Sequence, residues 1–388
     1  MTIIATPTTA VKFADFSETQ RNQFKTGVNI HGNTMLMPVK VGNTVTFPIK
    51  FYNNSIYDFY PSDNIYTSDI IEDSEGNIFT LELTTSYYIR LGFRCKIEIS
   101  GTTAKVNIDI PFTLGVFISK FGSVGSGNGQ FSFPNNIFVT ATNIYVADSS
   151  NNRIQIFDLN GTYVSKFGTV GSSNGQFSGP RGIHVTATNI FVVDAGNNRV
   201  QKFDLAGVYV SKFGTVGSSS GQFNGPEDIN VTATKIYVSD SGNNRIQRFS
   251  LAGVVETEFG TSGTGNGQFN NPQGIHVTST NIYVADRNNN RIQKFDLNGV
   301  YASKFGSLGS GNGQFSNPIG LFVTNSNIYV ADNVNHRIQI FDLNGNYVSK
   351  FGILGTGNGE FQYPTDVFLS TSYIYVVDQE SYRIQKFQ

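Results

Sequence analysis

An aspartate and an arginine recur together six times after residue 140, and an acid beside a guanidinium can bind anions or transfer protons. Successive copies are 46 residues apart. A catalytic group is needed once, whereas a residue present in every copy of a repeat serves the repeat. We therefore predict no catalytic role. The pair is expected to satisfy turn amides and to hold neighbouring units in register at Asp148, Arg153, Asp194, Arg199, Asp240, Arg245, Asp286, Arg291, Asp332, Arg337, Asp378 and Arg383.

Two of the four histidines, His184 and His276, occupy equivalent positions in two of the units. Histidines can bind zinc, but a zinc site takes about three or four ligands. The other copies of this position are Phe138, Asn230, Phe322 and Phe368. This substitution pattern favours packing and hydrogen bonding over metal binding, so we predict no metal and no cofactor.

Glycine-rich segments such as GSGNGQF resemble phosphate-binding loops only in composition. A phosphate-binding loop lies between a strand and a helix, with a Lys-Ser/Thr pair or a GxGxxG turn. Here the segment recurs between strands and is followed by Phe and Pro. We predict that its glycines let the chain cross from one unit to the next, and that the phenylalanine fills the gap between units.

Each unit contains four short apolar runs rich in Ile, Val, Tyr and Phe, separated by Asn/Gly turns. Such runs are typical of strands, and four strands every ~40–50 residues are typical of a propeller blade. The sequence therefore predicts an all-β fold: a six-bladed β-propeller over residues 113–388, preceded by a small antiparallel, sandwich-like β domain over residues 1–112. The single cysteine, Cys95, is expected to be a buried apolar residue of that first domain.

The repeated pattern resembles the NHL repeat. Pro272, Gly274, Ile275 and Val277, then the run 282–286 and Asn-Arg-Ile at 290–292, match it closely, and the resemblance covers residues 115–388. The absence of Trp argues against the WD type. The resemblance implies a closed ring. The last unit ends after its third strand, and residues 115–122 match a fourth strand, so we predict that they complete the last blade.

Positions that differ among the six copies are free of the blade's shared structural demand, and they mark where an asymmetric function can lie. They follow the repeated proline or lie in the turn after the repeated aspartate. In a four-stranded blade these two segments emerge on one face, which we predict as the binding surface. The candidate residues are Asn135, Arg181, Glu227, Asp228, Gln273, Arg287, Ile319, His336, Thr365, Glu380 and Tyr382.

Charge is nearly balanced, with 27 basic and 28 acidic residues, which does not favour nucleic-acid binding. No apolar stretch approaches the ~18 residues of a membrane span, and no secretory signal is evident. We expect a soluble protein, located in the cytoplasm or in a virion or extracellular assembly.

The leading hypothesis is non-enzymatic recognition or adhesion. The propeller would bind a protein or glycan, and residues 1–112 would anchor or oligomerise it, as in phage tail fibres and other viral host-recognition proteins. The resemblance leaves two alternatives open. One is a metal-dependent lyase or lactonase-like hydrolase, with Glu227, Asp228 and Asp366 as channel acids. The other is an RNA-binding NHL propeller.

Overall fold

The computed structural model divides the chain into two compact units, Met1–Leu114 and Gly115–Gln388. It describes residues 115–388 in full and, before them, only the backbone of strands β1–β9. These strands are β1 (Thr2–Ala5), β2 (Val28–Asn29), β3 (Val39–Val41), β4 (Thr44–Lys50), β5 (Tyr60–Pro61), β6 (Asp69–Glu72), β7 (Ile78–Phe79), β8 (Arg94–Ser100) and β9 (Thr103–Asp109).

The strands of the first unit pair as β1-β9-β8, β2-β5 and β3-β4-β6-β7. All these pairs are antiparallel, as expected, except β4 with β6, which is parallel. The packing of these sheets into a sandwich and the burial of the Cys95 side chain lie outside the described residues.

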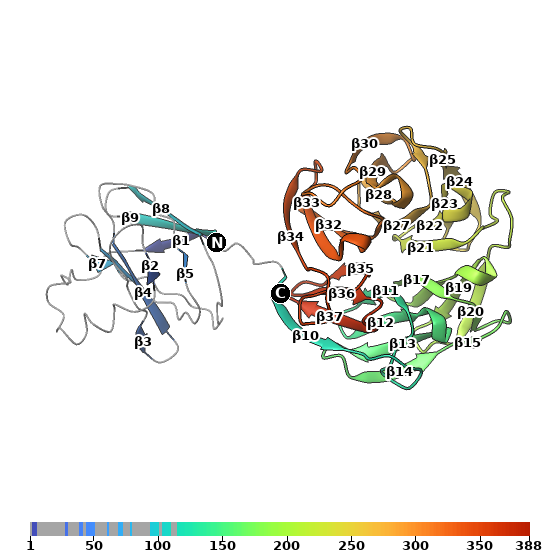
Figure 1. Cartoon of the computed structure of the whole chain (residues 1–388), viewed down its shortest axis with the longest axis horizontal. Coiled ribbons are helices and arrows are strands. Elements are labelled where there is room, and N and C mark those ends of the chain that lie inside the picture. Colours follow the sequence, from blue (N-terminus) through green and yellow to red (C-terminus); the bar gives the residue numbers. More distant parts are fainter. Residues whose placement is uncertain are drawn as a thin grey trace. The chain divides into compact units, whose positions relative to one another are not determined.

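The second unit is a ring of six four-stranded antiparallel sheets (Figure 1). The inner strands, which surround the central axis, are β11 (Pro134–Val139), β17 (Pro180–Val185), β21 (Pro226–Val231), β27 (Pro272–Val277), β31 (Pro318–Val323) and β35 (Pro364–Leu369). The second strands are β12 (Asn143–Asp148), β18 (Asn189–Asp194), β22 (Lys235–Asp240), β28 (Asn281–Asp286), β32 (Asn327–Asp332) and β36 (Ile374–Asp378).

The third strands are β13 (Arg153–Asp158), β19 (Arg199–Asp204), β23 (Arg245–Ser250), β29 (Arg291–Asp296), β33 (Arg337–Asp342) and β37 (Arg383–Phe387). The outer strands of the first five blades are β14 (Tyr163–Phe167), β20 (Tyr209–Phe213), β24 (Val255–Phe259), β30 (Tyr301–Phe305) and β34 (Tyr347–Phe351). Short parallel pairs, β15 (Thr169–Val170) with β16 (Gln176–Phe177) and β25 (Thr261–Ser262) with β26 (Gln268–Phe269), form in two of the glycine-rich loops.

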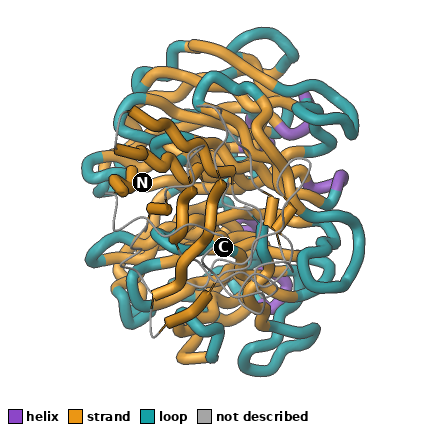
Figure 2. Tube along the Cα trace, turned by 90° about the vertical axis from the view of Figure 1, so that its left-hand side faces the viewer, coloured by secondary structure: helices purple, strands orange, loops and turns teal. Residues whose placement is uncertain are grey.

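The turn between the second and third strands is a short 3-10 helix in the first five blades. These turns are η2 (Ser149–Asn151), η3 (Ala195–Asn197), η4 (Ser241–Asn243), η5 (Arg287–Asn289) and η6 (Asn333–Asn335). Figure 2 shows them, in purple, gathered on one side of the ring. The residue that ends each turn has a left-handed backbone, which asparagine tolerates, as at Asn152 with a φ of 54°.

The hydrophobic core lies between neighbouring blades. One cluster joins Tyr145, Ala147 and Ile154 of the first blade to Ile183 and Val192 of the second. The predicted gap-filling phenylalanines are fully buried here, as Phe131, Phe177, Phe223, Phe269, Phe315 and Phe361. The core therefore depends on the contact between units, and no blade buries its apolar faces alone.

The ring closes as predicted, because a strand from the start of the array completes the last blade. Strand β10 (Phe117–Phe121) pairs antiparallel with β37, and the sheet order is β10-β37-β36-β35. Two backbone hydrogen bonds, from Gly115 N to Gln388 O at 3.0 Å and from Gln388 N to Val116 O at 2.9 Å, extend the pairing. The closure covers an edge of β37 that would otherwise be unpaired.

Candidate functional site

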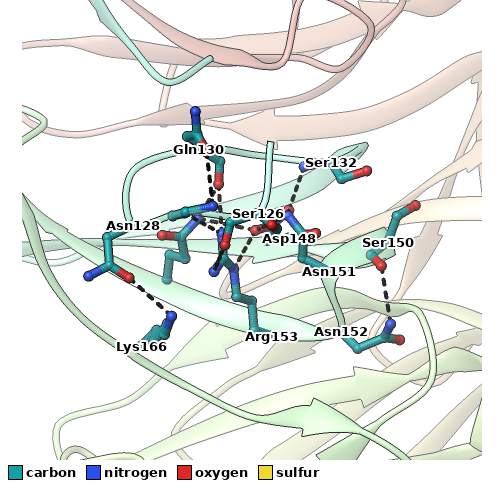
Figure 3. Close-up of polar contacts among 12 residues, drawn as sticks. Ser126, Asn128, Gln130, Ser132, Asp148, Ser150, Asn151, Asn152, Arg153 and Lys166 are labelled. Carbon is teal, nitrogen blue, oxygen red and sulfur yellow. Dashed lines mark hydrogen bonds and ion pairs between the residues drawn. The ribbon is translucent and has the colours of Figure 1, made fainter. Parts of the chain in front are cut away.

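The repeated aspartate and arginine form a buried ion pair in all six blades, with Nε–Oδ2 distances of 2.7–2.8 Å. In the first blade the Arg153 guanidinium also donates to the backbone carbonyls of Ser126, Gly127 and Gln130 (Figure 3). Those carbonyls belong to the glycine-rich loop that enters the blade. The Asp148 side chain accepts from Ser132 N at 2.8 Å. Both charged groups thus form hydrogen bonds with the loop that links one blade to the next.

A repeated glutamine, for which the sequence predicts no role, belongs to this network. The Gln155 side chain is fully buried. It donates to Gln130 O at 2.7 Å and to Asp148 Oδ2 at 3.1 Å, and it accepts from Gly129 N at 3.0 Å. The same glutamine recurs two residues after each repeated arginine, so its period was the available signal.

The variable positions gather at one end of the blades. Each inner strand has a register shift just after its proline, as between Pro134 and Ile137, which takes the two following residues out of the regular ladder. The turn after the repeated aspartate lies at the same end, because Pro134 pairs with Asp148. In four of the six blades the first side chain of this turn donates to the next blade's proline carbonyl, as Ser149 Oγ does to Pro180 O at 2.6 Å.

A charged cluster forms on this face from the second, third and fourth blades. Arg181 Nη1 lies 2.6 Å from Glu227 Oε2. Burial raises the pKa of Glu227, while the charges of Arg181 and Arg287 and hydrogen bonds from Arg181 and Gln273 lower it. Burial lowers the pKa of Arg287, and Glu227 opposes that effect. We call Arg181, Glu227, Gln273 and Arg287 the arginine cluster.

The second position after each proline carries Asn136, Asp228 or Asp366 in three blades and glycine in the others. Each of these side chains accepts a hydrogen bond from the backbone of the next blade: Asn136 from Ile183 N at 3.0 Å, Asp228 from Ile275 N at 2.9 Å, and Asp366 from Ile137 N at 3.1 Å. The glycines leave no room for a side chain, since a Cβ on Gly320 would lie 2.6 Å from Asp366 Cα.

The two acids of this layer have strongly perturbed acidities. Burial raises the pKa of Asp228 to about 7, against two hydrogen bonds from backbone N–H groups. Burial, helped by the charge of Asp228, raises the pKa of Asp366 well above its usual value. Asn136 Nδ2 is 3.5 Å from Asp228 Oδ1. The layer therefore joins blades to one another through side chains whose ionised form is disfavoured.

The two histidines of the inner strands lie in a series of aromatic contacts. His184 packs on Phe138 with ring centres 4.6 Å apart, and His276 packs on Phe322 at 4.7 Å. Phe368 joins the two phenylalanines at 4.9 Å each. Burial lowers the pKa of His184 to about 3 and that of His276 to about 4, so both rings are neutral at pH 7.

The remaining candidate residues do not make polar contacts with the arginine cluster. Thr365 is buried and donates to Asn135 O at 2.7 Å, and Ile319 is half-buried on its inner strand. His336 Nδ1 accepts from Tyr363 N, its ring packs on Tyr363, and the Glu380 charge opposes the burial that lowers its pKa. Tyr382 packs edge-on against Phe133. These contacts hold neighbouring blades together.

Within residues 115–388, no three histidine, cysteine or acidic side chains are grouped as they would need to be to hold a metal ion. Among the residues that the structure describes, no helix has both the length and the apolarity to cross a bilayer.

Comparison with known proteins supports the fold. A family model described as a 6-bladed beta-propeller matches residues 130–215 and 312–388, and the NHL repeat model matches residues 269–295. No curated protein matches the sequence.

Three solved structures show the same fold at low identity. A Bacteroides thetaiotaomicron protein of unknown function is 16% identical with a TM-score of 0.54, covering 92% of this chain and 97% of its own. An auxiliary nutrient binding protein from Bacteroides ovatus is 13% identical with a TM-score of 0.53, covering 87% and 95%. A gluconolactonase from Xanthomonas campestris is 12% identical with a TM-score of 0.51, covering 67% and 88%. Residues 115–388 are therefore a six-bladed β-propeller built from NHL-type repeats.

Proposed function

We propose that the propeller is a recognition module whose variable face binds a protein or glycan partner without chemical conversion. The arginine cluster carries this proposal. It is a group of charged residues that departs from the six-fold repeat, and it lies on the face where both variable segments emerge. Propellers with this fold include a binding protein and a lactonase, so the argument rests on these residues and not on the fold.

The residues that repeat in every blade support a binding role over a catalytic one. The Asp148 and Arg153 side chains pair with each other and hydrogen-bond to the loop. Their copies do the same, except that Arg245 Nη1 donates to Glu258 in place of a loop carbonyl. The His184 and His276 rings pack against phenylalanines. RNA binding is less favoured, because Glu227 offsets one of the two cluster arginines. In this proposal residues 1–112 anchor or oligomerise the module, in a virion or another assembly.

One observation favours a second candidate, an enzyme of the lyase or lactonase type. The pKa values of Asp228 and Asp366 are raised in the way that catalytic acids require. Each carboxylate, however, already accepts two hydrogen bonds from backbone N–H groups, which is sufficient reason for its presence.

A partner screen with two matched variants tests the recognition proposal. The face variant combines Arg181→Gln, Glu227→Gln and Arg287→Ser, and the control variant carries Arg248→Ile, which copies Ile156 and Ile340 of sister blades. Glycan arrays and purified candidate partners are probed with all three proteins. We expect a ligand that the wild type and the control variant bind and the face variant does not. A ligand that all three proteins bind equally would show that this face is not the binding surface. Turnover of a lactone or glycan substrate would favour the enzyme candidate over the recognition proposal.

A further inference from the structure

Arg287 lacks a hydrogen bond that four of its five counterparts in the other blades form. It is the first residue of the turn after the repeated aspartate. In four other blades the side chain at this position donates to the carbonyl of the next blade's repeated proline: Ser149 to Pro180, Ser241 to Pro272, Asn333 to Pro364 and Gln379 to Pro134. The remaining blade has Ala195, which cannot donate. Arg287 has five N–H donors, yet it forms no such bond to Pro318 in the described structure.

The Arg287 Nε is buried and has no hydrogen-bond partner in the described part of the chain. Arg248 Nε is the only other such side-chain atom there, and it lies 3.3 Å from Glu256 Oε2, so its charge is balanced. A buried donor of a charged group without a partner is unfavourable, and native proteins retain few of them. An unpaired donor in this setting indicates a group that a ligand satisfies.

The surroundings of Arg287 define what that ligand must be. Arg181 lies close enough for its charge to lower the pKa of Arg287, and 40% of its side chain is exposed. Glu227 binds one Arg181 nitrogen and keeps 13% of its side chain exposed. Gln273 is buried and donates to Asn271 Oδ1 at 2.8 Å, and it helps to lower the pKa of Glu227. Two guanidinium groups thus stand beside one carboxylate acceptor.

We propose that Arg287 and Arg181 bind the carboxylate of an acidic sugar, while Glu227 accepts hydrogen bonds from its neighbouring hydroxyl groups. A guanidinium can donate two parallel hydrogen bonds to a carboxylate. The cluster has a net charge of one when Glu227 is ionised, which suits a monoanion better than a doubly charged phosphate. The inference rests on the recognition function and gives it a ligand class.

Saturation-transfer NMR and calorimetric titration of the full chain with sodium glucuronate test the inference. Glucose, inorganic phosphate and a glutamate-rich peptide are titrated in parallel. The variant Arg287→Ser copies Ser149 and Ser241 and gains the bond to the next blade's proline, so its fold is expected to be kept. Arg248→Ile removes one positive charge outside the cluster. We expect glucuronate to bind the wild type and Arg248→Ile alike, and glucose to bind neither. We expect Arg287→Ser to bind glucuronate at least roughly tenfold more weakly than the wild type does.

Equal glucuronate binding by the wild type and Arg287→Ser would overturn the inference, and so would the absence of glucuronate binding. Tighter binding of phosphate or of the peptide would replace the acidic sugar with that ligand. The failure of the inference is distinguishable from the failure of the recognition function. If a partner binds the wild type and the control variant but not the face variant, the recognition function is supported even when glucuronate does not bind.

Discussion

The imidazole Nδ1 of His336 accepts a hydrogen bond from the backbone N–H of Tyr363 at 3.2 Å. In the four preceding blades an asparagine side-chain oxygen accepts the equivalent bond at 2.8–2.9 Å, with Asn152, Asn198, Asn244 and Asn290 as the acceptors. His336 also shares their left-handed backbone, with a φ of 54°. It is therefore a structural substitute for asparagine that joins the fifth blade to the sixth.

This substitution predicts an acid-sensitive link between those blades. Only neutral imidazole can accept at Nδ1, and burial lowers the pKa of His336 below its usual 6.5. A lowered folded pKa gives stability that is present above the unfolded value and is lost as pH falls through the folded value. Urea denaturation should show His336→Asn gaining stability over the wild type below pH ~6 and matching it at pH 8. A gap that does not change with pH would contradict this role.

Asp228 predicts the opposite pH dependence. Burial raises its folded pKa from 3.8 to about 7. The stabilisation that comes from protonation is therefore complete below pH 3.8, declines as pH rises and is lost above pH 7. Asp228→Asn copies Asn136, whose amide oxygen accepts the same kind of inter-blade bond. We expect the variant to be more stable than the wild type at pH 8 and to approach it at pH 5. The stability of each protein, measured from pH 5 to 8 by urea denaturation, decides the matter; a variant less stable at pH 8 would show that the charge is needed.

The period and spacing of the repeat predict the blade architecture well, because each unit contains four apolar runs and the same pattern recurs in six copies. Closure by residues 115–122 is visible for the same reason, since GVFISKFG ends in the same SKFG as the outer strands of four of the five other blades. The ion pair of Asp148 and Arg153 follows from its period.

Contacts across blades could not be read from the sequence. The proximity of Arg287 to Glu227 depends on the turn of one blade and the inner strand of its neighbour, which are 60 positions apart. His336 and Tyr382 differ from the asparagine of the other blades, but they keep its left-handed backbone conformation and a contact with the next blade. A repeat alignment shows which positions differ, but it does not show which differences are substitutes for the same contact.

The buried glutamine network predicts a large stability cost in a single blade. Gln293 donates to Gln268 O and to Asp286 Oδ2 and accepts from Gly267 N, at 2.7–3.0 Å. Gln293→Ala leaves Gly267 N without its acceptor, while Gln268 O and Asp286 Oδ2 keep their bonds from Arg291. The loss of a buried acceptor and of two further hydrogen bonds should lower the free energy of unfolding by about 2–3 kcal/mol in urea denaturation. Asn298→Ala is the control, because the side chain is exposed and Ala206 stands there in a sister blade. Equal losses of unfolding free energy in the two variants would show that the glutamine network does not stabilise the blade.

The packing of the two inner histidines predicts that chelation leaves stability unchanged. His184 and His276 are surrounded by phenylalanines and take the place that Phe138, Phe322 and Phe368 hold in other blades. The melting temperature of protein purified without chelator should be the same with and without EDTA, and metal analysis should find no stoichiometric zinc or calcium. The double variant His184→Phe/His276→Phe should fold. One tightly bound metal per chain, with a melting temperature that falls on chelation, would support the enzyme candidate instead.

Ring closure predicts a sharp difference between two truncations that differ by seven residues. A chain starting at Gly115 keeps β10, whereas one starting at Gly122 leaves β37 without its outer neighbour. Losing β10 also uncovers Phe387, which packs on Phe117 with ring centres 6.0 Å apart. We expect the longer chain to unfold in one cooperative transition, and the shorter one to melt at least several degrees lower, over a broader range, or to aggregate through the free edge. Superimposable melting curves for the two chains would show that the pairing of β10 with β37 does not hold the ring together.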